Sequence, residues 1–156
     1  LGCDACTVAP YMGRDSVEPF LQHPGRAAFV LCKTSNPGSA DFQELNVGDT
    51  PLYEQVAMQV SRWASGVPGT AGLVVGATQP EALRELRGLL PDAPFLIPGV
   101  GAQGGDAQTV MHIAGSGPVL VNSSRQIIYA SSGEDFADAA RQQAMLLNEQ
   151  LNRQQV

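Results

Sequence analysis

The amino-acid sequence predicts an α/β fold in which parallel strands are joined by helices. Two observations lead to this prediction. Short apolar runs of strand type alternate along the chain with stretches whose apolar residues recur at helical spacing. The 156 residues are 44% hydrophobic and only 15% charged, a composition that can bury a sizeable core and argues against disorder. Such alternation is typical of a parallel sheet with helical crossovers, here a single domain over residues 1–156.

Five runs are expected to be strands. The first, Asp4–Val8, is short, and the second, Ala27–Cys32, has the stronger apolar pattern. Gly72–Gly76 reads GLVVG, which is typical of a strand buried on both faces. The last two are the short apolar runs Phe95–Ile97 and Pro118–Asn122.

Four helices are expected between or after these strands. In Tyr53–Ala64 the apolar residues recur at helical spacing. Pro80–Leu90 has a proline in its first turn, a position that favours the start of a helix. Asp106–Ala114 is expected to be helical, and Phe136–Asn152 is a long polar helix rich in Ala and Gln.

The five strands fit two architectures, an open doubly wound sheet or strands 4 to 8 of a (β/α)8 TIM barrel with their helices. Gly2 resembles the residue that follows a helix, yet no helix precedes it. Leu1 also stands where an initiator methionine is expected. We therefore expect a preceding part of the fold to be missing; if the fold is a barrel, this chain is a partial β/α barrel without its N-terminal strands 1 to 3. The longest polar loop is expected at Asn36–Thr50.

Charge and hydropathy exclude several classes of protein. The formal net charge of −6 and the pI of about 4.7 argue against a nucleic-acid partner. No run approaches the length of a membrane span, and the first residues lack the basic segment of a signal peptide. We therefore expect neither a membrane partner nor a secreted protein.

The cysteines favour a structural role. Cys3 and Cys6 form a lone CxxC pair, and no second such pair follows. The histidines His23 and His112 lack the spacing of metal ligands. We expect no metal site, and the free thiols indicate a reducing, cytoplasmic environment.

The segment Leu96–Asp106, LIPGVGAQGGD, places four glycines within seven residues directly after an expected strand. Glycines let a backbone approach a ligand closely, and phosphate is the commonest ligand that requires this. The glycines also match GxGxxG, the dinucleotide fingerprint, and Arg125 beyond the next strand would suit the 2′-phosphate of NADP. That fingerprint usually follows the first strand of a sheet, however, whereas this loop follows the fourth.

A barrel accounts for more of these features. In β/α barrels a phosphate site is often made by the loops after strands 7 and 8. If the expected strands are numbers 4 to 8, PGVGAQGG follows strand 7, and Asn122–Arg125, NSSR, ends strand 8. Arg125 would then bind the phosphate bidentately. After the second strand, KTSNPGS offers Ser35 and Asn36 as short partners for a planar polar ring, although Asn-Pro-Gly is also strong turn chemistry.

Five segments in this order resemble the orotidine 5′-phosphate decarboxylase family, especially its longer bacterial branch. They are CDACTVAPYMG, FVLCKTSNPGSADFQ, LVVGAT, LIPGVGAQGGD and VLVNSSRQIIYAS. The resemblance implies a β/α barrel and a carboxy-lyase of pyrimidine nucleotide synthesis. Such an enzyme removes CO2 from orotidine 5′-monophosphate (OMP) to give UMP without cofactor or metal. It also implies a cytoplasmic homodimer with sites near the subunit interface.

The resemblance implies site residues as well. The substrate-binding positions of the family correspond here to Ser35, Pro98, Val100, Gln103, Ser124 and Arg125. Gln103 and Arg125 match phosphate ligands, with the Ser124 backbone beside them. Ser35 matches the serine that hydrogen-bonds the pyrimidine. Pro98 and Val100 match the wall of the base pocket.

The resemblance is incomplete. Ala9 stands where family members often have Asn or His, so no ribose contact is expected there. The catalytic DxKxxD motif of the family's strand 3 is absent, and the only lysine, Lys33, precedes the pyrimidine-binding serine. We expect this chain to be the binding portion of the enzyme, inactive by itself. The alternatives are another phosphate-binding barrel enzyme and a non-enzymatic nucleotide-binding fragment.

Overall fold

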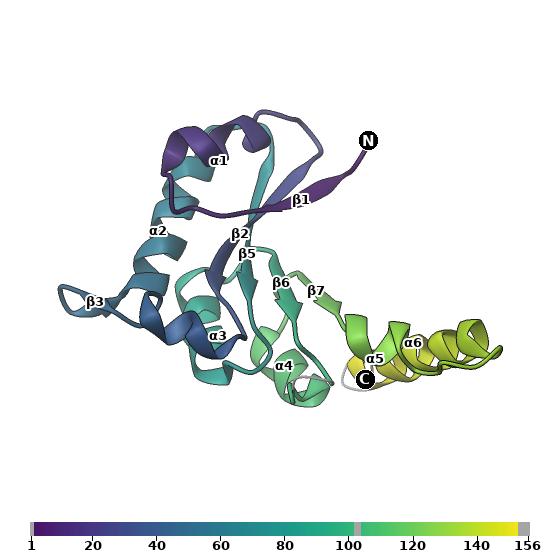
Figure 1. Ribbon diagram of the computed structural model, residues 1–156. Helices are drawn as coiled ribbons and strands as arrows, with labels where there is room; N and C mark the ends of the chain where they lie inside the picture. The colour runs from purple at the N-terminus through teal and green to yellow at the C-terminus, as the bar shows by residue number, and fades with distance from the viewer. Residues whose placement is uncertain (1, 102–103, 153–156) are drawn as a thin grey trace.

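The computed structural model of the chain describes residues 2–101 and 104–152. Its centre is a five-stranded parallel sheet that curls as part of a barrel (Figure 1). The strands are β1 (Ala5–Val8), β2 (Ala27–Lys33), β5 (Thr70–Val75), β6 (Phe95–Pro98) and β7 (Val119–Asn122). All five lie where the sequence predicts a strand.

The order of the strands decides between the two predicted architectures. Within the described residues the order is β1-β2-β5-β6-β7, which is the order along the chain. A doubly wound sheet reverses its order at a switch point, where the dinucleotide binds. This sheet has no such reversal, so the NADP-binding alternative is wrong and the partial barrel is confirmed.

Helices cover one face of the sheet. In Figure 1, α1, α2 and α3 lie together on one side of the strands. The helices are α1 (Arg14–Leu21), α2 (Leu52–Ala64), α3 (Pro80–Leu89), α4 (Ala107–Ala114), α5 (Ser124–Ile128) and α6 (Phe136–Asn152). No helix of the described residues has the length and hydropathy needed to cross a membrane.

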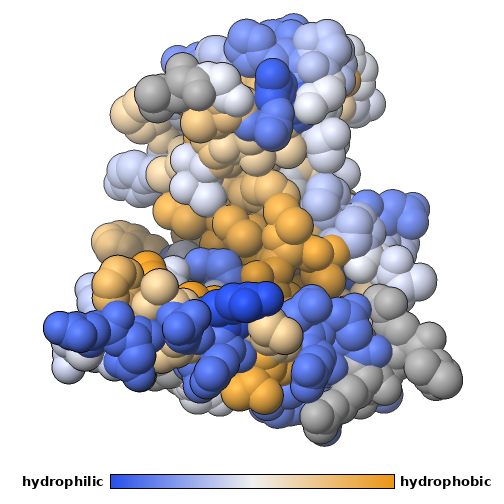
Figure 2. Space-filling view, turned by 90° about the vertical axis from the view of Figure 1, so that its right-hand side faces the viewer, coloured by the Kyte–Doolittle hydropathy of each residue, from blue (hydrophilic) through white to orange (hydrophobic). Residues whose placement is uncertain are grey.

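The core lies between the sheet and these helices. Alternate strand residues such as Val30, Leu73 and Ile97 are almost fully buried there. The other face of the sheet is open, and Leu31 and Leu120 are 38% and 55% exposed. Figure 2, which shows this side of the molecule, has apolar side chains gathered across its middle. A closed barrel would bury this face in its interior.

Two helices were not predicted from the sequence. α1 contains Pro19, which weakens helix propensity, yet it forms because Val17 and Leu21 are fully buried in the core. α5 has five residues, too few for a periodic pattern.

The expected loop at 36–50 is partly wrong as well. It contains a 3₁₀ helix, η1 (Pro37–Asp41), and a small antiparallel pair, β3 (Asn46–Val47) with β4 (Thr50–Pro51). Turn chemistry such as Asn-Pro-Gly does not distinguish these short elements from a plain loop.

An arginine secures the amino ends of β6 and β7. Nη1 of Arg87 donates to the carbonyls of Leu90, Pro91 and Ala93 at 3.3, 3.0 and 2.7 Å. Nη2 donates to Pro118 O at 3.3 Å, and the guanidinium lies 3.9 Å from the centre of the Phe95 ring. Burial lowers the pKa of Arg87. This contact is on the edge of the sheet opposite the candidate site.

Candidate functional site

The predicted binding residues lie at the carboxyl edge of the sheet. Pro98 ends β6, Ser35 follows β2, and Val100 lies in the glycine loop. Carboxyl ends of parallel strands meet at one edge, so these segments share a side of the sheet. Ser124 and Arg125 begin α5 just after β7. Arg125 is therefore helical, whereas the sequence pattern predicts it at the end of a strand. Gln103 lies outside the described residues.

The glycine loop after β6 closes on itself. Gly99, Gly101 and Gly104 have φ of 95°, 78° and 90°, which side-chain-bearing residues rarely adopt. The amides of Gly101, Gly104 and Gly105 donate to Gly105 O, Gly101 O and Gly99 O at 2.9, 2.8 and 3.2 Å. The N–H groups of these three glycines are thus engaged in shaping the loop.

The loop after β6 and the segment after β7 are joined by Ser123. Its hydroxyl, in a residue only 5% exposed, donates to Val100 O at 2.8 Å and lies 3.2 Å from Oε1 of Gln126. Gln126 packs so closely on Gly101 that a Cβ there would collide with its amide. The glycine loop and the start of α5 are thus in direct contact.

A small cavity lies between these two segments. It has a volume of about 60 Å³ and is lined by Pro98, Gly99, Val100, Asn122, Ser123, Ser124 and Arg125. Pro98 and Asn122 are paired in the β6–β7 register, which brings the two loops side by side. Arg125 is exposed and has no ion-pair partner among the described residues. The cavity is of a size for a small anion, with the arginine as its countercharge.

The start of α4 is already occupied by a protein carboxylate. Asp106 accepts from the Thr109 hydroxyl and from the Thr109 amide, both at 2.7 Å. These hydrogen bonds hold the pKa of Asp106 below its ordinary value. This N-cap satisfies a donor of the helix start, so an anion beside the glycine loop is better served by Arg125 than by α4.

Close backbone packing links Ser35 to the glycine loop. A Cβ on Gly76, just after β5, would lie 2.8 Å from Ser35 N. The next residue, Ala77, donates its amide to Pro98 O at 2.8 Å, and its side chain abuts Gly105. The loops after β2, β5 and β6 therefore pack against one another at the edge of the sheet where Ser35 and the small cavity both lie.

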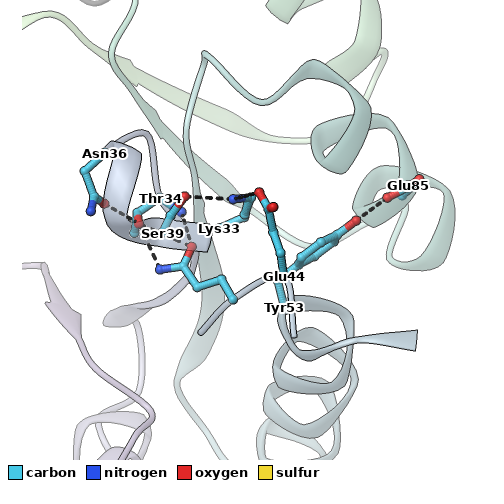
Figure 3. A network of polar contacts seen from close by, with 8 residues as sticks. Lys33, Thr34, Asn36, Ser39, Glu44, Tyr53 and Glu85 are labelled. Atoms are coloured by element: carbon cyan, nitrogen blue, oxygen red, sulfur yellow. Dashed lines mark hydrogen bonds and ion pairs between the residues drawn. The ribbon is translucent and has the colours of Figure 1, made fainter. Parts of the chain in front are cut away.

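Polar contacts fix the loop that carries Ser35 (Figure 3). Nζ of Lys33, a residue 2% exposed, donates to Ser39 Oγ and pairs with Glu44 Oε1, both at 2.8 Å. Gln43 Oε1 accepts from Thr34 N at 2.8 Å, and Thr34 Oγ1 donates to Asn36 Oδ1 at 2.6 Å. Asn36 thus takes part in the turn, in keeping with the simpler interpretation of KTSNPGS.

Two neighbouring residues complete the surroundings of this loop. Cys32 donates its thiol to Tyr53 O at 3.1 Å, and burial raises the pKa of Cys32 to about 12. The Tyr53 hydroxyl bonds to Glu85 and joins α2 to α3, and burial together with Glu85 raises its pKa. No cluster of metal-ligating side chains occurs in the described ranges, 2–101 and 104–152.

Sequence reasoning missed Ser123, Gln126 and Asn122 as parts of the site. Ser123 and Asn122 belong to the quoted segment NSSR, but serine and asparagine at a strand end are ordinary loop residues. Only the structure shows that Ser123 is buried and bonded to Val100 O, and that Gln126 reaches Gly101.

Comparison with known proteins gives consistent matches. A model of the "Orotidine 5'-phosphate decarboxylase / HUMPS family" matches residues 1–141. Orotidine 5′-phosphate decarboxylase of Delftia acidovorans is 48% identical over 155 residues, covering 96% of this chain and 56% of the relative. That of Variovorax paradoxus is 50% identical over 149 residues, covering 92% and 54%. The chain spans about half the length of these curated relatives.

Comparison with solved structures gives the same family. The UMP synthase of Leishmania donovani matches with a TM-score of 0.79 at 43% identity, over 97% of this chain and 34% of that protein. The OMP decarboxylase of the same organism matches with a TM-score of 0.76 at 40% identity, over 94% of this chain and 56% of that protein. With a family match over residues 1–141 and a partial barrel of the same architecture, the chain belongs to the orotidine 5′-phosphate decarboxylase / HUMPS family.

Proposed function

We propose that these residues form the phosphate- and base-binding part of an orotidine 5′-phosphate decarboxylase, which converts OMP to UMP and CO2. One observation carries the proposal: Arg125, which has no ion-pair partner within the described ranges, lines an anion-sized cavity against the glycine loop, at the edge of the sheet where Ser35 follows β2. A nucleoside monophosphate presents a phosphate and a planar polar ring, and these two features call for such a pair of subsites.

Each residue has a role in this proposal. Arg125 supplies the countercharge for the 5′-phosphate, and the backbone at Ser124 lies beside it at the start of α5. Ser35 hydrogen-bonds the pyrimidine, and Pro98 and Val100 form the wall of the base pocket. Gln103 is proposed as a further phosphate ligand from the family resemblance alone.

The chemistry needs more than these residues. Loss of CO2 leaves electrons on a ring carbon, which must then receive a proton. Lys33, the only lysine of the sequence, is buried and engaged with Ser39 and Glu44, so it is not placed as that donor. We propose that the Asp/Lys array lies outside these 156 residues and that the complete barrel carries the activity.

Assembly and location belong to the same proposal. We expect a homodimer, as the resemblance to the family implies. The thiols of Cys3, Cys6 and Cys32 are all free, which supports a reducing, cytoplasmic location.

The test is the binding of UMP and of uridine to the complete protein and to its Arg125→Ala variant. A hydrogen bond to a charged group contributes roughly 1.5–3 kcal/mol, and each 1.4 kcal/mol is about tenfold in affinity. We therefore expect Arg125→Ala to weaken UMP binding by about ten- to a hundredfold and to leave uridine binding almost unchanged. Arg141→Ala, an exposed arginine on α6, is the matched control.

Other outcomes have defined meanings. Equal losses for UMP and uridine would mean that Arg125 supports the fold. No loss for either ligand would refute the phosphate subsite. Equal binding of ribose 5-phosphate and UMP would favour a different phosphate-binding barrel enzyme, because Ser35 would then contribute nothing.

A further inference from the structure

We infer that Lys33 is a positioning residue for nucleobase recognition: its buried ammonium group holds the 34–45 segment so that Ser35 faces the pyrimidine. The inference rests on the proposed function and deepens it. Lys33 does not contact the substrate in this proposal. It acts through the loop that follows it.

Lys33 ends β2 and reaches two points of the following segment. Its Nζ donates to Ser39 Oγ in η1 and pairs with Glu44 Oε1, each at 2.8 Å (Figure 3). Lys33 is 2% exposed and Ser39 is 4% exposed, whereas the Glu44 side chain is 51% exposed. One buried cation therefore fixes both the middle and the far end of the segment.

A second set of contacts runs in parallel with the first. The amide of Thr34 donates to Gln43 Oε1 at 2.8 Å, and Gln43 Nε2 donates back to Thr34 Oγ1 at 2.9 Å. Gln43 N also donates to Ser39 O at 2.9 Å. Lys33 and Thr34 are thus tied to the adjacent pair Glu44 and Gln43, immediately before Ser35.

The opposite side of Ser35 is rigid. Gly76 N donates to Lys33 O at 2.7 Å, and Gly76 packs directly on the Ser35 backbone. Movement of Ser35 toward β5 is blocked by this contact. Any displacement of the loop on loss of the Lys33 contacts is therefore expected to be away from β5.

The charge of Lys33 is the essential feature of this arrangement. An apolar side chain of similar length fills the same space but leaves the buried Ser39 hydroxyl without its donor. It also frees the Glu44 carboxylate to turn into water, because that side chain is already half-exposed. Lys33→Met therefore removes two contacts while preserving most of the packing.

The experiment compares ligands that differ in the base. Binding of UMP and of ribose 5-phosphate is measured for the complete protein and for Lys33→Met, Glu44→Gln and Ser35→Ala. We expect Lys33→Met to weaken UMP binding by about three- to tenfold, the range of one hydrogen bond, with ribose 5-phosphate unchanged. Lys33→Met combined with Ser35→Ala should lose no more than the larger of the two single losses, because both act through one contact.

Hydrogen exchange gives a readout that needs no ligand. Amides in 34–45 should exchange faster in Lys33→Met, while the α3 amides keep their rates. The control is Arg14→Met, which breaks the exposed pair with Glu18 in α1 and should leave both the exchange in 34–45 and the UMP affinity unchanged. If Lys33→Met fails to fold, Glu44→Gln carries the test, since it keeps the lysine.

The outcomes separate this inference from the proposed function. Failure of the unaltered protein to bind UMP overturns the proposed function and the inference with it. If UMP binds and Ser35→Ala weakens it, but Lys33→Met or Glu44→Gln changes neither binding nor exchange, only the inference falls. An equal loss for UMP and ribose 5-phosphate in Lys33→Met also overturns it, because the effect would be a general one.

Discussion

Replacement of Arg87 by alanine is expected to destabilise the protein without altering its ligand site. The side chain comes from α3 and joins the segment 90–93 to Pro118, just before β6 and β7. It also covers the Phe95 ring, and Gly117 is packed so closely against it that no side chain fits there. The contact therefore holds the amino ends of the two strands whose carboxyl ends carry the anion cavity.

The expected magnitude follows from these contacts. The bonds to Ala93 O and Pro91 O, at 2.7 and 3.0 Å, are the short ones, and the two at 3.3 Å add little. Bonds to a charged group contribute about 1.5–3 kcal/mol each, but burial of the guanidinium and its unpartnered Nε offset part of this. We expect a loss of about 3 kcal/mol in the free energy of unfolding.

The assay is denaturant unfolding, supported by thermal melting. A loss of about 3 kcal/mol lowers the midpoint of melting by roughly 6–12 °C for a protein of 150–250 residues. The stability of Arg87→Lys should lie between that of the unaltered protein and that of Arg87→Ala, because lysine keeps the charge but lacks the planar guanidinium. Arg84→Ala, an exposed position on the same helix, is the control and should change stability by less than about 0.5 kcal/mol.

Two results would refute this reasoning. A loss below about 1 kcal/mol for Arg87→Ala would show that water replaces the arginine at little cost. A changed affinity of the folded variant for UMP would show that the two edges of the sheet are coupled.

Three further predictions concern other parts of the molecule. Asp106→Ala should lower stability by about 1 kcal/mol at neutral pH. The folded-state pKa of Asp106 is depressed, so its contribution to the free energy of unfolding is present above the ordinary pKa and is lost as the pH falls through the folded-state pKa. The unfolding curves of the unaltered protein and of Asp106→Ala should therefore converge in acid. Curves that stay apart would contradict this. Cys32, whose pKa burial raises to about 12, should react with thiol reagents only on unfolding, whereas Cys3 and Cys6 react in the native state, as mass spectrometry can verify. Residues 1–156 alone should not decarboxylate OMP, and turnover that Lys33→Ala abolishes would disprove this. The edge strand β1 should make these residues associate, and a stable monomer in ultracentrifugation would disprove that.

The sequence predicts the sheet better than it predicts the site. Apolar runs such as Ala27–Cys32 mark strands because burial imposes their composition, and the glycine loop is visible because its φ values exclude other residues. The helix α1 was missed because Pro19 lowers the helix propensity of this segment, whereas burial of Val17 in the core stabilises the helix.

The contacts within the site could not be predicted from the sequence, for a different reason. The partnership of Lys33 with Glu44 spans eleven residues, and that of Ser123 with Val100 spans twenty-three. Neither pair produces a periodic pattern in the sequence, because each contact depends on how separate loops meet after the strands have assembled. The family resemblance implied a role for Val100 but none for Glu44 or Ser123, and it did not imply these contacts.

The interlock between Gly101 and Gln126 bears on how this binding surface could be transferred or redesigned. The amide of Gln126 occupies the space that any side chain at 101 would need, and Ser123 bonds to the backbone in between. The two segments therefore contact each other directly, although they follow different strands. A graft of the glycine loop into another barrel should therefore include Ser123, whose hydroxyl bonds to Val100 O. Likewise, positions 101 and 126 should be varied together in a directed-evolution library, because the Gln126 amide must move before position 101 can carry a side chain.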